Sequence, residues 1–215
     1  MSRPTEKDIG QYFDETVDCC APRRDAGKRP GVDLAQLLRM RLREAGLENA
    51  DVLELGCGRG ELALELLQDG ASNVVGFDLS SDAIEYAQRI AREDGVASRA
   101  EFRSGNAATA DLPRREVVVH HRVICCYPDS SQLLANSIGA AGRMYAFSMP
   151  RSRGIWGLFV KVALRFENLI HLLKRRGFRA YVHDERIVES ALTRAGFELH
   201  GRSNRRGWFA AVYVR

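Results

Sequence analysis

Three glycines at alternate positions follow an acidic residue in the segment DVLELGCGRG, residues 51–60. Gly56, Gly58 and Gly60 leave bare backbone directly after an apolar run of strand length, and a segment of helical period follows. This arrangement lets a ligand approach the backbone at the carboxyl end of a sheet strand. The spacing therefore predicts a nucleotide-type binding pocket.

Two common nucleotide-binding motifs do not fit this turn. The dinucleotide fingerprint has its third glycine where this chain has Glu61, and a charge is poorly suited to close packing of helix on strand. A phosphate-binding loop needs Gly-Lys-Ser or Gly-Lys-Thr, which does not follow the turn here. The turn therefore favours a ligand that carries no pyrophosphate or triphosphate.

The glycine turn, preceded by Glu54, resembles the first motif of the class I S-adenosylmethionine-dependent methyltransferases. That ligand carries a sulfonium cation, so a nearby acidic residue is electrostatically favourable. The resemblance implies that Asp78, which ends the expected strand in NVVGFDLS, accepts hydrogen bonds from the ribose hydroxyls. It also implies that Asn106, in SGNA, accepts one from the adenine amino group. Capping or turn roles for Glu54 and Asp78 are the alternative.

Methyl transfer is an in-line displacement at carbon, so the enzyme mainly holds donor and acceptor in line and excludes water. A general base is dispensable for a carboxylate or thiolate acceptor and useful for a hydroxyl or a phenol. The cofactor-binding residues that the resemblance implies are Glu54, Gly56, Cys57, Gly58, Gly60, Asp78, Leu79, Asn106, Ala107 and His121. The candidate catalytic residues are Tyr12, His121 and Tyr127, and no metal ligand is expected. One of the adjacent His120 and His121 should point into packing.

Outside the cofactor half, the chain is similar to the magnesium-protoporphyrin methyltransferase-like group. The similarity lies in QYFDETV, YPD, AFSMP and RAYVHDERIVESALTRAGFEL. It implies a Rossmann-like seven-stranded methyltransferase sheet with an antiparallel last strand, and an N-terminal lid segment, residues 1–30, that closes over the cofactor. Tyr12 corresponds to the aromatic residue that lies near the reacting methyl group. Cys126 stands where that group has a histidine, which leaves the acceptor open.

Apolar runs of strand length alternate with segments of helical period, which predicts an α/β fold with helices around a mainly parallel sheet. The expected strands are residues 50–55, 73–79, 99–105, 115–124 and 142–150, and the expected helices are residues 8–20, 30–47, 60–70, 80–94 and 184–197. Residues 198–204 and 207–215 are close enough for an antiparallel hairpin. The apolar and basic stretch 151–180 is a helical insertion after the fifth strand, either lying over the sheet or covering the substrate.

Composition places the chain among ordinary globular proteins. It has 215 residues, 45% hydrophobic and 28% charged, which suits one methyltransferase domain over residues 1–215. No segment reaches the apolar length of a membrane span, and the first residues are charged, which favours a cytoplasmic protein.

The five cysteines favour free thiols in a reducing compartment. Four of them form two adjacent pairs, Cys19 with Cys20 and Cys125 with Cys126. Neighbouring cysteines point apart on a strand and lie about 100° apart on a helix, so neither pair is expected to chelate alone. A soft-ion site would need one thiol from each pair.

The leading interpretation is an S-adenosylmethionine-dependent methyltransferase that acts on a small organic acceptor, with O-methylation favoured. One alternative is a magnesium-protoporphyrin or related carboxylate methyltransferase. Another is a tRNA or rRNA methyltransferase, suggested by the basic runs KRRGFR (174–179) and GRSNRRG (201–207), and a third is a non-catalytic module that binds the cofactor. A net charge of +4 permits an anionic partner without requiring one, so nucleic acid is the less favoured partner.

Overall fold

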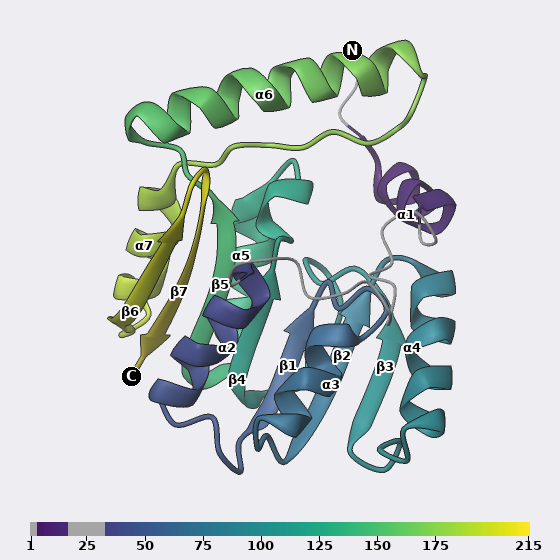
Figure 1. Ribbon diagram of the computed structural model, residues 1–215, viewed down its shortest axis with the longest axis vertical. Coiled ribbons are helices and arrows are strands. Elements are labelled where there is room, and N and C mark those ends of the chain that lie inside the picture. The colour runs from purple at the N-terminus through teal and green to yellow at the C-terminus, as the bar shows by residue number, and fades with distance from the viewer. Residues whose placement is uncertain (1–3, 17–32) are drawn as a thin grey trace.

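A seven-stranded sheet organises the computed structural model of the protein, which describes residues 4–16 and 33–215 (Figure 1). The strands are β1 (Asp51–Leu55), β2 (Asn73–Asp78), β3 (Ala100–Ser104), β4 (Arg115–His121), β5 (Ala141–Pro150), β6 (Glu198–Arg205) and β7 (Trp208–Val214). Their order across the sheet is β3-β2-β1-β4-β5-β7-β6. The first five strands are parallel, and β7 is antiparallel to both β5 and β6. The predicted sheet and its antiparallel last strand are confirmed.

Helices cover both faces of the sheet. On one face lie α2 (Leu34–Glu44), α3 (Glu61–Gln68) and α4 (Ser81–Glu93), and on the other lie α5 (Ser130–Ala140) and α7 (Glu185–Arg194). Two helices stand apart from these faces, α1 (Glu6–Thr16) and α6 (Gly154–Leu173), beyond the carboxyl ends of the parallel strands (Figure 1). Among the helices of residues 4–16 and 33–215, none combines the length and apolar character needed to cross a bilayer.

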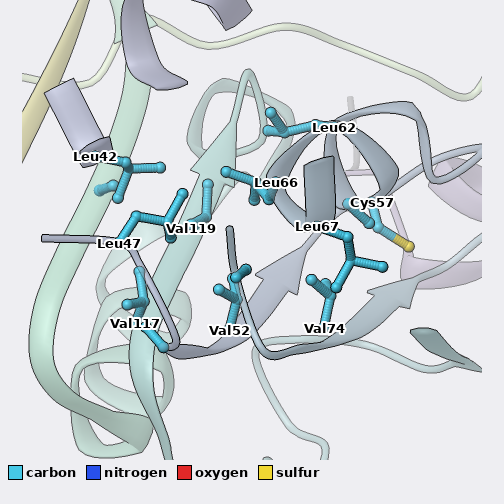
Figure 2. Packing of buried hydrophobic residues seen from close by; sticks show 14 of the residues in the cluster. Leu42, Leu47, Val52, Cys57, Leu62, Leu66, Leu67, Val74, Val117 and Val119 are labelled. Carbon is cyan, nitrogen blue, oxygen red and sulfur yellow. The ribbon is translucent and has the colours of Figure 1, made fainter. Parts of the chain in front are cut away.

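The central strands are buried on both sides, as parallel strands in such a sheet are. Along β1, Val52 packs into the cluster beneath α2 and α3, whereas Leu53 packs into the cluster beneath α5 and α7. Figure 2 shows the first cluster, in which Val52, Val117 and Val119 from adjacent strands meet leucines such as Leu66. This two-sided core fixes the strands whose carboxyl ends carry the candidate site.

Two elements differ from the expected pattern. β4 ends at His121 rather than at residue 124, because Arg122 has a left-handed backbone conformation, φ +62°, that ends the strand. A short 3-10 helix, η1 (Ile124–Cys126), follows it. The expected insertion after the fifth strand is helical, but α6 crosses the carboxyl-end edge of the sheet and does not lie over a face (Figure 1).

Gly76, in the middle of β2, allows the close approach of the glycine turn. A Cβ at this position would lie 2.7 Å from Phe102 and 2.8 Å from the Cys57 sulfur. We expect Gly76→Ala to lower the free energy of unfolding by about 1–3 kcal/mol, because the packed neighbours must shift. Gly139→Ala, in α5, is the control, since its Cβ would meet no atom within 4 Å. That variant should be as stable as the wild type or more stable by up to about 1 kcal/mol in urea unfolding. Equal stability of Gly76→Ala and the wild type would contradict the packing.

Candidate active site

A cavity of about 480 Å³ lies at the carboxyl ends of the parallel strands, where α1 and α6 contribute to its wall. The predicted site residues that line it are Tyr12, Gly56, Gly58, Asp78, Leu79, Ala107, His121 and Tyr127. Four predicted cofactor residues do not line it, namely Glu54, Cys57, Gly60 and Asn106. The structure thus brings predicted cofactor and catalytic residues together in one cavity, whereas part of the predicted cofactor set does not line it.

The three glycines of the turn lack a Cβ for different structural reasons. A Cβ at Gly56 would collide with the side chain of Val123, and one at Gly60 would lie 2.9 Å from Phe102. Both glycines therefore serve packing inside the protein. Gly58, with φ +52°, also has a left-handed backbone, but its Cβ would meet no atom within 4 Å. Because Gly58 lines the cavity, the room beside it is available to a ligand.

Asp78 joins the glycine turn to the end of β2. Its Oδ2 accepts a hydrogen bond from the Gly58 amide at 2.7 Å, and its Oδ1 accepts one from the Ser80 amide at 2.9 Å. Burial raises the pKa of Asp78, although these amide donors oppose the shift by stabilising the charged form. Each carboxylate oxygen keeps further acceptor capacity, so Asp78 can hold the turn and still accept from ligand hydroxyls.

Glu54 and Cys57 lie behind the turn. Glu54 is only 2% exposed, and burial raises the pKa of its carboxyl group well above its ordinary value. Its Oε2 has no hydrogen-bond partner among the residues described. Burial also raises the pKa of the Cys57 thiol, which packs on the β2 backbone beside Gly76. Neither side chain lines the cavity, so a direct contact of either one with the cofactor remains a prediction.

Asn106, a predicted cofactor residue, is linked to α1. Its Nδ2 donates to Oε2 of Glu6 at 2.9 Å, and its Oδ1 accepts from the Ala108 amide at 2.9 Å. A second link to α1 is the Ser80 hydroxyl, which donates to Oδ1 of Asp14 at 2.6 Å. These two hydrogen bonds hold α1 beside the predicted cofactor residues, the region in which the resemblance implies that the N-terminal segment lies.

Aromatic packing joins α1 to the segment that follows α6. The Tyr12 ring stacks on Phe178 with 4.4 Å between centroids, and the buried His171 ring meets Tyr12 edge-on at 5.3 Å. Tyr12 and Phe178 both line the cavity. The wall opposite the strands therefore includes stacked aromatic rings from two segments far apart in the sequence, together with Leu164 and Glu167 of α6.

The paired histidines at the end of β4 point in opposite directions, as expected. His120 is fully buried against Tyr145, with ring centroids 5.4 Å apart. His121 lines the cavity, with its Nδ1 2.9 Å from the Ser148 hydroxyl oxygen. Burial, with a smaller contribution from the Arg122 charge, lowers the pKa of His121 to about 4. The His121 imidazole is therefore neutral near pH 7 and can accept a hydrogen bond or, weakly, a proton.

The protonation of His120 should affect how the free energy of unfolding depends on pH. Burial lowers its pKa to about 3, against about 6.5 for an unperturbed histidine. Between these values the unfolded chain binds a proton that the folded chain does not, so stability is lost as the pH falls below about 6.5. At about pH 5 the loss from this group is about 2 kcal/mol.

The variant that isolates this effect is His120→Leu. We expect its free energy of urea unfolding to differ less between about pH 7 and about pH 5 than that of the wild type, by about 2 kcal/mol. The same pH dependence in both proteins would contradict a neutral, buried His120.

Arg122 is a cavity residue that sequence reasoning missed. Its amide donates to both the hydroxyl and the carbonyl oxygen of Ser148, which supports the left-handed backbone at this position. The guanidinium carbon lies 5.1 Å from the ring centroid of Trp208, and both residues line the cavity. An arginine directly after a buried strand was the available signal. Arg122 brings a positive charge to the wall of the cavity.

The adjacent thiols of Cys125 and Cys126 lie together, with 4.0 Å between their sulfur atoms. The prediction that adjacent cysteines point apart is wrong here, because the residues form a 3-10 turn rather than a strand or an α-helix. The hydrogen bond between the two thiols lowers the pKa of Cys125 and raises that of Cys126. Cys19 and Cys20 lie outside the described residues. Within residues 4–16 and 33–215, no group of three or more possible metal ligands is found.

Tyr127 is held by its backbone at the edge of the cavity. Nε2 of His183 lies 2.9 Å from the Tyr127 carbonyl oxygen, and Nδ1 of His183 lies 3.2 Å from the Ser130 hydroxyl. His183 therefore positions the loop after β4. Burial raises the pKa of the Tyr127 phenol, so this hydroxyl stays protonated near pH 7 and can donate a hydrogen bond.

The sheet order, the glycine turn and the carboxylate at the end of β2 define a class I methyltransferase fold. A family model described as "Methyltransferase domain" matches residues 47–177, more than half of the chain. The chain therefore belongs to this methyltransferase family. S-adenosyl-L-methionine is the methyl donor of the class, as the sequence predicts. The open space at Gly58 and the remaining acceptor capacity of Asp78 fit such a ligand.

Relatives of known structure share this architecture. Magnesium protoporphyrin IX methyltransferase from Synechocystis PCC 6803, with bound SAH, has a TM-score of 0.74 and 20% identity, covering 98% of this chain and 99% of that chain. Geranyl diphosphate C-methyltransferase from Streptomyces coelicolor A3(2) has a TM-score of 0.71 and 14% identity, with complete coverage of both chains. At these identities the likeness shows the fold.

A curated relative matches part of the chain. The ribosomal protein L11 methyltransferase of Shewanella baltica is 30% identical over 98 residues, which are 46% of this chain and 33% of that protein. The chain thus matches about a third of the length of this relative.

Proposed function

We propose that the protein transfers a methyl group from S-adenosylmethionine to an oxygen atom of a small organic acceptor. The observation that carries this proposal is one cavity lined by two different sets of residues. Gly58 and Asp78 are the predicted cofactor residues among them, and His121, Arg122 and Tyr127 supply polar groups for an acceptor. Aromatic residues of α1 and of the segment after α6 close the side opposite the strands.

The chain's own residues would bind, orient and shield the reactants. Gly58 and Asp78 would hold the cofactor, which when bound supplies an electrophilic methyl group on its sulfonium. Tyr12 and Phe178 would exclude water from the cavity. His121, held by Ser148, and Tyr127, held through His183, would orient the acceptor oxygen by hydrogen bonds.

A carboxylate acceptor is the candidate that Arg122 favours. A carboxylate is already ionised near pH 7, so its methylation needs no general base. This suits His121, because its lowered pKa makes it a weak base, while Arg122 supplies a charge to pair with an anion. Among oxygen acceptors, a carboxylate is therefore the favoured class.

Two experiments test the proposal. Calorimetry measures the binding of S-adenosylmethionine and S-adenosylhomocysteine, and an assay with labelled S-adenosylmethionine then measures methyl transfer to a panel of acceptors. The panel pairs apolar carboxylic acids with the matching alcohols and phenols. We expect both ligands to bind and label to enter an oxygen, with carboxylic acids favoured over alcohols. No binding of either ligand at millimolar concentration would contradict the proposal, and binding without transfer to any acceptor would favour the non-catalytic alternative.

Nucleic acid is the less favoured acceptor because one of the two basic runs is partly neutralised. In the run 201–207, Arg202 pairs with Glu185 at 2.7 Å and with Glu189 at 3.3 Å. Salt-sensitive binding of transfer RNA in a gel shift would reverse this preference.

A further inference from the structure

Helix α6 presents one narrow face to the rest of the protein. On this face Leu164 lines the cavity, and Val160 lies against Gly207 in the turn of the β6–β7 hairpin. The Asn168 side chain donates to the Ala180 carbonyl at 2.8 Å and accepts from the Ala180 amide at 2.9 Å. Near the end of the helix, His171 is buried beside Tyr12. These contacts fix which side of α6 faces outward.

The outward side is apolar along the whole helix. Its residues recur at intervals of three and four, which places them on one face, opposite the contacts described above. They are Ile155, Leu158, Phe159, Val162, Phe166, Leu169 and Leu173. Their exposed fractions run from 48% for Leu169 to 74% for Leu173. A surface helix of a globular protein normally turns its apolar face to the core, so the orientation of α6 is inverted. An exposed apolar surface of this kind marks an interaction site.

Basic residues lie beside this apolar face and next to its ends. The basic residues of segment 151–179 are Arg151, Arg153, Lys161, Arg165, Lys174, Arg175, Arg176 and Arg179, against one carboxylate, Glu167. This segment alone carries more positive charge than the +4 of the whole chain. Lys161 and Arg165, one helical turn apart, are exposed and border the apolar stripe. Three further basic residues, 174–176, follow directly after the helix and are also exposed.

We propose that the outward face of α6 docks on a membrane surface that carries anionic lipids, with the helix lying in the plane of the interface. An apolar stripe bordered by lysine and arginine is the composition of interfacial helices. Long basic side chains can extend from the apolar stripe to the lipid phosphates. A second copy of the chain fits this face less well, because pairing two copies would bring their basic borders together.

The docked orientation has a consequence for the cavity. The outward face of α6 would contact lipid, while Leu164 and Glu167 of the same helix line the cavity. The cavity then lies next to the membrane surface. The docking itself does not depend on the proposed methyl transfer.

Flotation of the full chain with vesicles tests the docking. We expect binding to phosphatidylcholine vesicles that contain phosphatidylserine, weak binding to phosphatidylcholine alone, and weaker binding as salt rises. The double variant Phe159→Ser, Phe166→Ser should bind anionic vesicles at least roughly tenfold more weakly than the wild type, since it loses apolar area that enters the interface. Lys161→Glu, Arg165→Glu should lose most of the preference for anionic lipid.

The matched control replaces exposed apolar residues elsewhere. Ile187→Ser, Leu199→Ser changes side chains that are 46% and 53% exposed on α7 and β6, and it should bind vesicles like the wild type. Calorimetric binding of S-adenosylhomocysteine checks the fold of each variant and tests the proposed function separately.

Three results would overturn the docking. The first is equal vesicle binding by the Phe159→Ser, Phe166→Ser and Ile187→Ser, Leu199→Ser proteins, and the second is no binding of the wild type to anionic vesicles. The third is a dimer in sedimentation velocity that only the Phe159→Ser, Phe166→Ser protein loses, since this would assign the face to a second copy.

Discussion

Replacing Gly58 by leucine is expected to abolish measurable binding of S-adenosylhomocysteine in calorimetry. The bare backbone at Gly58 faces space in which a Cβ meets no atom of the protein. A leucine side chain would therefore extend into the cavity and occupy volume that the ligand needs. We expect the dissociation constant to rise by at least roughly 100-fold, since the ligand could bind only by displacing the side chain.

The leucine also carries a backbone cost that must be separated from this effect. Gly58 has φ +52°, where a residue with a Cβ is disfavoured by about 1–2 kcal/mol. Gly95, after α4, is a matched control with φ +71° and no atom within 4 Å of its Cβ position. Gly95→Leu should lose similar stability in urea unfolding and keep wild-type affinity. A comparable loss of affinity in both variants would show that backbone strain, rather than occupied space, is responsible.

Asp78→Ala is expected to weaken S-adenosylhomocysteine binding by roughly 100-fold. Hydrogen bonds to a charged acceptor contribute about 1.5–3 kcal/mol each, so losing two from the ribose hydroxyls is sufficient for this change. The substitution also releases the Gly58 and Ser80 amides, which now donate to the carboxylate. Both losses act at the same end of the cavity.

Asp78→Asn and Asp82→Ala separate these contributions. Asparagine keeps one acceptor oxygen, so its affinity should fall between those of the wild type and Asp78→Ala. Asp82 is an exposed carboxylate in the first turn of α4 and should be replaceable without effect on affinity. Wild-type affinity of Asp78→Ala would remove the ribose assignment and leave the carboxylate with only its turn-holding role.

The elements around the glycine turn could be predicted from sequence because their signals are local. A strand, a glycine turn and a helix occur in succession around Gly58, and the strand that follows ends at Asp78. Sequence could not show that only Gly58 leaves room for a ligand. That distinction depends on Val123 and Phe102, which meet the positions of Gly56 and Gly60 from elsewhere in the fold.

The wall opposite the strands could not be predicted in the same way. Helical periodicity shows that α6 has an apolar stripe, but not whether that stripe faces the protein or the solvent. The direction is set by long-range contacts such as Asn168 with Ala180 and Tyr12 with Phe178. Similarly, the meeting of the two thiols at Cys125 and Cys126 depends on the end of β4 at His121, which is caused by the backbone at Arg122.

The position of β7 has a consequence for the order in which the chain folds during synthesis. β7 is the last strand in sequence, yet it lies between β5 and β6. Until residues 208–214 leave the ribosome, β5 keeps an unpaired edge and β6 has no neighbour in the sheet. Trp208, which lines the cavity near Arg122, arrives with the same strand. The nascent chain can therefore assemble the half of the sheet that carries Gly58 and Asp78 early, whereas the part of the cavity wall that holds Trp208 is complete only after β7 has been inserted.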